Sequence, residues 1–325
     1  MAKKIRRAPV CTKYDAVVIG NISYEKNIDH LQNIEQREGG SIVYSTLAGI
    51  SNNFKLAVVT KLAEKNKDLL NPLNADHVDL FIKYCKNTTL TQNELCGDNN
   101  EKVITQCFCR STPIYPDDIP NVESYFYVFV GDFLGDIPFE TIKHCAKYGY
   151  IALDASCFLK KVNPETKEVY QEYYDDIELI ASYCDIFKLT REQAELITGE
   201  DDPLEAAKII RSWGTREILI TDGTLLHLYD ENEKYWEVAI KEFATHGRLY
   251  RGTTAFMAYV GHRITSDPQM SLFCAGATAM FKLSRPGPAR CNRAEMNMYL
   301  ESFYYTVEIL ENGFTPLDCF DEDIN

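Results

Sequence analysis

The sequence has no apolar run near the length of about 18 residues that a membrane-spanning helix needs. Its longest run, YFYVFVG at Tyr125–Gly131, has the length of a strand. Positive charge is also scarce, because 34 Lys and Arg residues stand against 48 Asp and Glu, for a net charge of −14. The single basic cluster is KKIRR at Lys3–Arg7. We therefore expect neither a membrane span nor a surface for nucleic acid.

The cysteines lack a disulfide or zinc pattern. There are 11 of them, scattered, and the closest pair, Cys107 and Cys109, has a spacing that places both thiols on one face of a strand. The basic N-terminal residues are followed by APVCTKYD, not by the apolar core of a secretory signal. These absences lead us to expect reduced thiols in a cytoplasmic protein.

What the sequence does contain is an alternation of buried strands and amphipathic helices. Apolar runs predict strands at Tyr14–Ile22, Lys55–Ala63, Tyr125–Gly131, Gly149–Ser156, Cys184–Thr190 and Glu217–Gly223. Helical patterns lie at 39–54, 138–149, 191–199 and 203–214. This order predicts an α/β fold with a doubly wound, mostly parallel sheet flanked by helices.

One segment interrupts the alternation. Residues 87–114 contain two extended stretches around the turn sequence GDNN at Gly97–Asn100, which predicts a β-hairpin. The hairpin is polar enough to lie outside the main sheet. Parallel sheets bind ligands at the carboxyl ends of their strands, so we expect the hairpin to form a small lid there.

The stretch YRGTTAFMAYV, Tyr250–Val260, is the first candidate site. A helix beginning at its glycine would present unpaired N–H groups and the positive end of the helix dipole to an anion. Gly252 would allow close approach of the backbone, and Thr253 or Thr254 could cap the helix. The alternative is a capped core helix with no ligand.

Three further features could line the same crevice. Thr190 and Gln193 fit a capping box at the start of a helix, which suffices as a structural explanation. Glu25 follows the first strand and could accept hydrogen bonds from substrate hydroxyls, or be a solvated loop acid. The pair Gly39–Gly40 would bring the backbone close to a small ligand, or simply begin a helix.

Taken in order, these segments resemble the PfkB-type, ribokinase-like family of carbohydrate and nucleoside kinases. The likeness covers residues 14–288 and rests on GGSIVYSTLAGI, FYVFVG, IALDASCFLK, DIFKLTREQAELITG, ILITDG and the C-terminal stretch from GRLYRGTTAF to RPGP. The resemblance implies a central sheet with a β lid formed by residues 25–38 and 87–114. Residues 289–325 would be a C-terminal helical extension.

The resemblance also implies roles for individual residues. They are catalysis by Arg251, Gly252 and Thr253, substrate binding by Glu25, Gly39, Gly40 and Ser41, nucleotide binding by Thr190, Thr221 and Gly223, and metal binding by Gln193. ATP and Mg²⁺ are the implied cofactors, and a small polyol or nucleoside is the implied ligand. Lids of this family often pair with a second copy, so the resemblance implies a homodimer through the lid as one possibility, and a monomer with an exposed polar edge is the alternative.

The C-terminal signature departs from the family's Gly-Arg-Gly-Asp-Thr. The position of the catalytic Asp is Thr253, which cannot take a proton near neutral pH, and the first glycine is Tyr250, preceded by Leu249. Two hypotheses follow. In the first, the chain is an ATP-dependent kinase of a sugar, cyclitol or nucleoside that uses another base, such as His246 or Asp222, or relies on anion-hole and metal positioning alone. In the second, it is a catalytically inactive protein that binds a small molecule or a partner.

A dinucleotide oxidoreductase is a third class, and the sequence disfavours it. The stretch after the first strand, VVIGNISYEKN, lacks the glycine fingerprint that brings a pyrophosphate onto the first helix of a dinucleotide fold.

Overall fold

The computed structural model describes residues 13–97, 102–223, 225–240, 249–284, 287–305, 307–310 and 313–316, with side chains up to residue 301 except that of residue 293. A large sheet runs through the described chain in the order β16-β17-β15-β14-β13-β12-β9-β8-β1-β4-β5. Its strands are β1 (Tyr14–Ile19), β4 (Leu56–Leu62), β5 (Val78–Tyr84), β8 (Ser124–Phe129), β9 (Tyr150–Asp154), β12 (Ile186–Thr190), β13 (Glu217–Asp222), β14 (Leu225–Tyr229), β15 (Tyr235–Ala239), β16 (Val307–Leu310) and β17 (Gly313–Pro316).

In the spatial order of the sheet, the neighbouring strands β5, β4, β1, β8, β9, β12 and β13 pair in parallel. Beyond β13, the strands β14 and β15 add in antiparallel fashion. The predicted doubly wound, mostly parallel sheet is therefore confirmed. The helices are α1 (Ser41–Ser51), α2 (Phe139–Cys145), α3 (Ser156–Leu159), α4 (Ile177–Ala181), α5 (Arg191–Thr198), α6 (Pro203–Ser212), α7 (Arg251–His262), α8 (Pro268–Leu283) and α9 (Arg293–Tyr305), with short 3₁₀ segments η1 (Glu64–Leu73) and η2 (Pro116–Asp118).

Each parallel strand contributes side chains to two hydrophobic cores, one on each face of the sheet. In β1, Ala16 and Val18 pack with α1, α7 and α8, whereas Val17 and Ile19 pack with α2 through α6. Successive side chains of a strand point to opposite faces, so a strand covered on both sides must be apolar at every position. This is why the strands appeared in the sequence as unbroken apolar runs.

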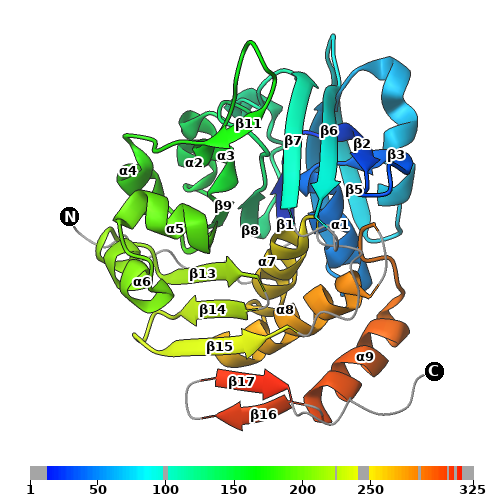
Figure 1. Cartoon of the computed structure of the whole chain (residues 1–325). Coiled ribbons are helices and arrows are strands. Elements are labelled where there is room, and N and C mark those ends of the chain that lie inside the picture. Colours follow the sequence, from blue (N-terminus) through cyan, green and yellow to red (C-terminus); the bar gives the residue numbers. More distant parts are fainter. Residues whose placement is uncertain are drawn as a thin grey trace.

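A second, four-stranded sheet stands beside the large one, next to α1 (Figure 1). Its order is β3-β2-β6-β7, with bounds β2 (Ser23–Ile28), β3 (Ile34–Gly39), β6 (Thr89–Cys96) and β7 (Lys102–Cys109). The predicted hairpin is confirmed in β6 and β7, which pair antiparallel. We call β3-β2-β6-β7 the small sheet. Segments 25–38 and 87–114 thus meet in one element, although β2 and β6 are far apart in the sequence.

Helix starts follow the local sequence with one exception. Gly40 precedes α1 at φ 85°, and Thr190 and Gln193 form the expected capping box of α5. The expectation that Thr253 or Thr254 caps α7 is wrong. The N-cap is Tyr250, at φ 58° and without a side-chain cap, and both threonines lie inside the buried helix. The chain enters α7 through this left-handed residue, so the helix begins one turn earlier than the threonines suggested.

The sequence did not predict some of the other strands. The strand β5 was missed, as was the antiparallel pair β10 (Lys160–Val162) and β11 (Val169–Gln171). Of the expected helical extension at 289–325, the described residues form the helix α9, and they continue as the strands β16 and β17, of which β17 joins the edge strand β15. No helix in the described part of the chain is long and apolar enough to cross a membrane.

Candidate functional site

Glu25 is the buried carboxylate at the junction of the small sheet and the body. It is 0% exposed, and its Oε1 accepts hydrogen bonds from the Gly40 N–H at 2.9 Å and from the Ser23 hydroxyl at 3.3 Å. Its side chain lies over Gly39, where a Cβ would overlap the carboxyl group. Burial raises the pKa of Glu25, and the hydrogen bonds oppose that rise in part. Glu25 and the glycine pair therefore meet, as the sequence indicated.

Tyr250 connects this carboxylate to α7. Its hydroxyl donates a hydrogen bond to Glu25 Oε1 at 2.5 Å, and its ring stacks on Tyr44 with centroids 4.4 Å apart. Burial, and then the charge of Glu25, raise the pKa of Tyr250 well above its usual value, so the phenol stays protonated and acts as the donor. Tyr250 thus occupies Oε1 of Glu25, the carboxylate that was expected to accept hydrogen bonds from substrate hydroxyls.

Asp132 is a functional candidate that the sequence analysis missed. It follows β8, and its Oδ1 accepts a hydrogen bond from the Ser41 hydroxyl at 2.6 Å and from the Ser41 N–H at 3.1 Å. Burial raises its pKa to about 7. Gly40 is needed here, because a Cβ would lie 2.9 Å from Asp132 Oδ2 and the backbone has φ 85°. Ser41 is thereby held at the start of α1, beside the glycine pair.

At the N-terminus of α7, Thr253 contacts a second buried acid. Its hydroxyl lies 3.3 Å from Asp154 Oδ2, which also forms an ion pair with Lys188 Nζ at 3.0 Å. Burial alone would raise the pKa of Asp154, but the Lys188 ammonium and the Ser156 N–H outweigh it and the pKa is lowered. Asp154 is therefore ionised and neutralised in place, which makes it a weak proton acceptor.

Gly252, at the start of α7, packs against residues near the carboxyl ends of β12 and β13. A Cβ there would lie 3.0 Å from Thr221 Oγ1 and 3.3 Å from Lys188 Cε, so a larger residue would separate α7 from the strand ends. Thr221 is paired with Thr190 across β13 and β12. Gly223 follows, exposed and at φ 44°. The predicted nucleotide residues and the start of α7 thus lie along one edge.

Asp222 and His246 are the two residues suggested as replacement bases, and the structure describes only the first. Asp222, near Gly223, forms an ion pair with Arg191 at 3.0 Å. His246 lies outside the described residues. Within the described residues, no hydrogen bond or ion pair joins Asp222 to Thr253.

The amide of Gln193 does not fit a magnesium ligand. Its Oε1 accepts from the Thr190 N–H at 3.0 Å, and its Nε2 donates to Ser156 Oγ at 3.1 Å. Both ends of this fully buried amide are therefore used within the protein. No group of three or more His, Cys, Asp or Glu residues is placed to hold a metal within the described ranges. We derive no step through a metal ion.

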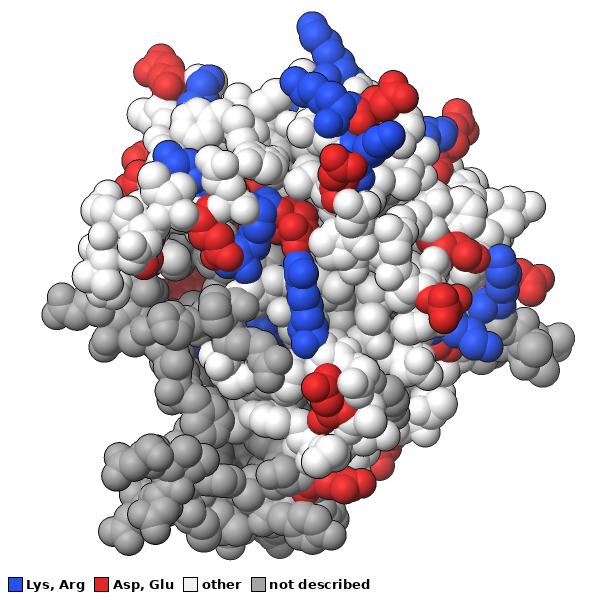
Figure 2. Space-filling view, turned by 90° about the vertical axis from the view of Figure 1, so that its right-hand side faces the viewer, with Lys and Arg blue, Asp and Glu red and all other residues white. Residues whose placement is uncertain are grey.

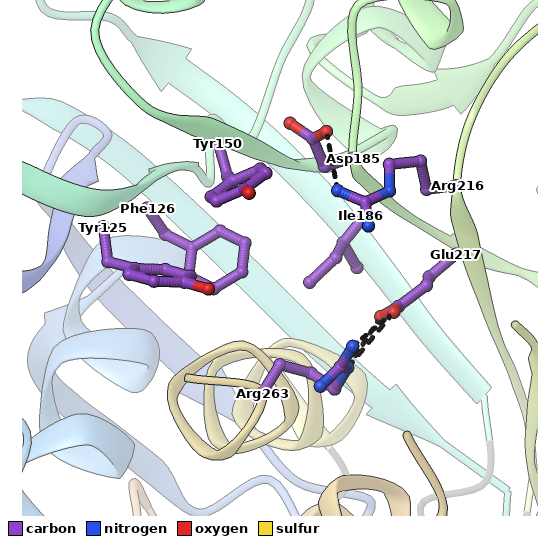
Figure 3. Close-up of a pocket in the computed structure, with 8 residues that line it drawn as sticks. All are labelled: Tyr125, Phe126, Tyr150, Asp185, Ile186, Arg216, Glu217 and Arg263. Carbon is purple, nitrogen blue, oxygen red and sulfur yellow. Dashed lines mark hydrogen bonds and ion pairs between the residues drawn. The ribbon is translucent and has the colours of Figure 1, made fainter. Parts of the chain in front are cut away.

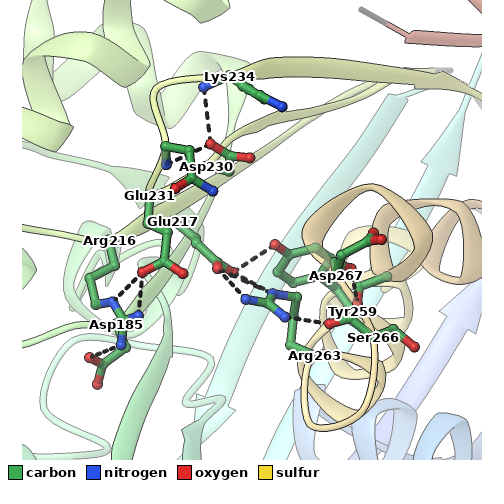
Figure 4. A network of polar contacts seen from close by, with 12 residues as sticks. Asp185, Arg216, Glu217, Asp230, Glu231, Lys234, Tyr259, Arg263, Ser266 and Asp267 are labelled. Atoms are coloured by element: carbon green, nitrogen blue, oxygen red, sulfur yellow. Dashed lines mark hydrogen bonds and ion pairs between the residues drawn. The ribbon is translucent and has the colours of Figure 1, made fainter. Parts of the chain in front are cut away.

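A pocket at the opposite edge of the sheet has a structural explanation. Figure 3 shows it among the amino ends of the strands, lined by Tyr125, Phe126, Tyr150, Asp185, Ile186, Arg216, Glu217 and Arg263. Arg263 Nη2 lies 2.8 Å from Glu217 Oε1, and Arg216 forms an ion pair with Glu231 (Figure 4). Both guanidinium groups are thus neutralised by neighbouring carboxylates, and the pocket lies away from the predicted residues.

The face toward β3, η1 and α9 carries mixed charge. Figure 2 shows Lys and Arg interspersed with Asp and Glu over the coloured part of this face, without a continuous region of either sign. Charges of both signs distributed in this way are typical of a solvated surface.

No family model matches the sequence, and no curated protein is significantly similar to it. Solved structures are similar in fold. One is a pyrophosphate-dependent kinase in the ribokinase family complexed with a pyrophosphate analog and myo-inositol, with 22% identity, TM-score 0.78, and coverage of 87% of this chain and 99% of that chain.

Two others have lower identity. A putative ribokinase II from E. coli in complex with ATP and Mg²⁺ shares 14% identity over 89% of this chain and 99% of that chain, with TM-score 0.68. Aminoimidazole riboside kinase from Salmonella enterica, complexed with aminoimidazole riboside and an ATP analog, shares 14% over 88% and 99%, with TM-score 0.66. At these identities the likeness is one of fold, and it confirms the expected fold.

Proposed function

We propose that this chain, which has the ribokinase-like fold, transfers a phosphoryl group to a hydroxyl of a small polyol, namely a sugar, a cyclitol or a nucleoside. The observation that carries the proposal is the hydrogen bond from Tyr250, the N-cap of α7, to Glu25. This hydrogen bond links the start of α7, whose unpaired N–H groups could bind an anion, to the buried carboxylate of Glu25, which could accept a hydrogen bond from a substrate hydroxyl. Phosphoryl transfer needs these two features next to each other.

In this proposal, the acceptor end is formed by Glu25, Gly39, Gly40 and Ser41, with Asp132 holding Ser41 in position. An acceptor hydroxyl would take the place of the Tyr250 hydroxyl on Glu25 Oε1. Because this oxygen already accepts from Gly40 and Ser23, its position is fixed before a ligand binds. Such preorganisation avoids the free-energy cost of ordering the group on binding.

The donor end would be formed by α7 and the strand ends beside it. Arg251 and the first N–H groups of α7 supply positive charge, and Lys188 lies against Gly252. Thr190, Thr221 and Gly223 extend this edge and suit the oxygen atoms of a di- or triphosphate. ATP, which is bound in one structural neighbour, or pyrophosphate, on which another neighbour depends, would supply the phosphoryl group.

Residue 253 offers no carboxylate that could take the proton from the acceptor hydroxyl. Thr253 hydrogen-bonds to Asp154, which Lys188 neutralises, so strong general-base catalysis is not available from this pair. Phosphoryl transfer through a loose transition state depends mainly on positioning and charge neutralisation. We therefore propose slow transfer, with the factor of about 10²–10⁴ that a base supplies left unused.

Binding without transfer is the second candidate function. The Tyr250 hydroxyl already fills the hydrogen-bonding site on Glu25, and Thr253 stands where a base is expected. A protein that binds a polyol and signals this to a partner would need the acceptor end alone.

Product formation tests the proposal. The purified chain is incubated with a panel of sugars, cyclitols and nucleosides, and with either ATP or pyrophosphate, and phosphorus NMR detects any new phosphomonoester. We expect a phosphomonoester from at least one acceptor, and none from the Glu25→Gln variant. Binding of an acceptor without product from either donor would favour the second candidate, and failure to bind any acceptor would contradict both.

A further inference from the structure

Two buried polar atoms lack a partner at the acceptor end. They are Glu25 Oε2 and Arg37 Nε, which have no hydrogen bond among the described residues. Glu25 and Arg37 are directly opposite each other in the antiparallel pair β2–β3, so both side chains lie on the same face of the small sheet. A buried acceptor and a buried donor therefore lie side by side, and neither is satisfied.

The rest of the Arg37 guanidinium is held in place. It forms an ion pair with Glu35, and it packs so closely on Gly287 that a Cβ there would overlap Nη1. Only 14% of the side chain is exposed. The group is therefore largely removed from water while one of its donors has no acceptor, which leaves a hydrogen bond to be gained on binding a ligand.

A second basic side chain lies beside the stacked rings of Tyr44 and Tyr250. Lys282 in α8 is fully buried, with Nζ 5.4 Å from the centre of the Tyr44 ring, which in turn stacks on Tyr250. Burial, together with the charges of Arg37 and Arg251, lowers the pKa of Lys282 to about 7, and Glu25 opposes this shift. Two basic side chains, Arg37 and Lys282, thus lie close enough to Glu25 to interact with its charge.

We propose that the acceptor is an acidic polyol. One of its hydroxyls takes the place of Tyr250 on Glu25 Oε1, a second donates to Glu25 Oε2, and a carboxylate or phosphate oxygen accepts from Arg37 Nε. The inference rests on the proposed function and narrows its substrate class. One ligand satisfies both unpartnered atoms, and its negative charge lies next to Arg37 and Lys282. A neutral polyol would satisfy Glu25 but would accept only a weaker hydrogen bond from Arg37.

Calorimetric titration with matched ligands tests the inference. The pairs are glucitol with gluconate, which adds a carboxylate, and myo-inositol with its monophosphate, which adds a phosphate. We expect at least one anionic member to bind about tenfold more tightly than its neutral partner at pH 6.5 and low salt, as expected for one added charge-assisted hydrogen bond. The pair that shows the preference identifies the acid group.

Variants separate a specific contact from general attraction by charge. Arg37→Gln should abolish the preference because it weakens binding of the anionic members much more than binding of the neutral ones. Lys102→Gln, on the exposed part of β7 in the same sheet, should keep the preference. Circular dichroism confirms that both variants fold. If Arg37→Gln unfolds the chain, Arg37→Lys, which keeps the charge but loses the planar fork, should reduce the preference in its place.

The outcomes distinguish this inference from the proposed function. Equal or weaker binding of the anionic members, with phosphorylation of a neutral polyol, would overturn the acidic acceptor and leave the transferase intact. A preference that survives both Arg37→Gln and Arg37→Lys would also overturn it. Failure of every polyol to bind would overturn both proposals.

Discussion

The hydroxyl of Tyr250 lies 2.5 Å from Oε1 of Glu25, so the residue that begins α7 occupies the carboxylate that would hold an acceptor hydroxyl. An acceptor hydroxyl that binds Oε1 must displace this phenol. The contact therefore makes Tyr250 a competitor of the acceptor, and it sets the affinity that the wild-type chain can reach.

Replacing Tyr250 by Phe should raise the affinity for the acceptor. The variant keeps the ring that stacks on Tyr44 but removes the hydroxyl, so Glu25 Oε1 becomes available to the ligand. A hydrogen bond to a charged group contributes about 1.5–3 kcal/mol, and we expect affinity to rise about tenfold by calorimetry. Tyr259→Phe is the matched control, since it removes a 2.7 Å bond to Glu217 at the opposite edge. Equal affinities in wild type and Tyr250→Phe would show that the phenol does not compete.

Replacing Thr253 by Asp should increase phosphoryl transfer. A carboxylate at this position could take the acceptor proton, and general-base catalysis is worth about 10²–10⁴-fold. The new acid would lie beside Asp154, so we also expect a lower melting temperature. Thr253→Asn has similar size and no charge, and its rate should remain at the wild-type level. A rate unchanged by Thr253→Asp would mean that the acceptor hydroxyl does not reach residue 253.

Lys282 should make the stability of the chain depend on pH. Its pKa is about 7 in the folded chain, against 10.5 for an ordinary lysine. Between these values the unfolded chain binds more protons, so this residue makes the free energy of unfolding rise as pH increases from 7 to about 10. Denaturant unfolding at several pH values should show the rise in wild type and in Lys143→Met, an exposed control, but not in Lys282→Met. An unchanged slope in Lys282→Met would contradict the lowered pKa.

Asp132 should make the free energy of unfolding fall as pH rises through the acid range, which is opposite to the effect of Lys282. Burial raises its pKa from 3.8 to about 7, so folding favours the protonated form and this contribution is lost as pH rises from 4 to 7. Asp132→Asn keeps the shape without the titration. Its free energy of unfolding should fall less steeply over that range than that of wild type. Parallel pH profiles of the two proteins would show that Asp132 does not titrate there.

The sequence could predict the parallel strands because a strand buried on both faces is apolar throughout, as in Val17–Ile19. It could also predict the capping box of Thr190 and Gln193, whose partners are three residues apart. Both features depend on residues that are close together in the chain, where periodicity and short spacings carry the signal.

The sequence could not predict the polar partners that complete the site. Asp132 reaches Ser41 across 91 positions, and Asp154 reaches Thr253 across 99. Each acid is a single residue at the end of a strand, and which other strand end it meets depends on the order of the sheet. The start of α7 was misplaced for a related reason, because a left-handed tyrosine has no sequence signal comparable to that of glycine.

The measurement that tests the shared pocket most directly is the affinity for pyrophosphate with and without a saturating acceptor, by calorimetry. If Tyr250 joins the acceptor carboxylate to the start of α7, displacing it from Glu25 must change the donor end, and by linkage the two affinities are coupled. We predict that the acceptor changes pyrophosphate affinity at least about fivefold, and that Tyr250→Phe reduces this coupling. Identical pyrophosphate affinity in the two titrations would contradict the account.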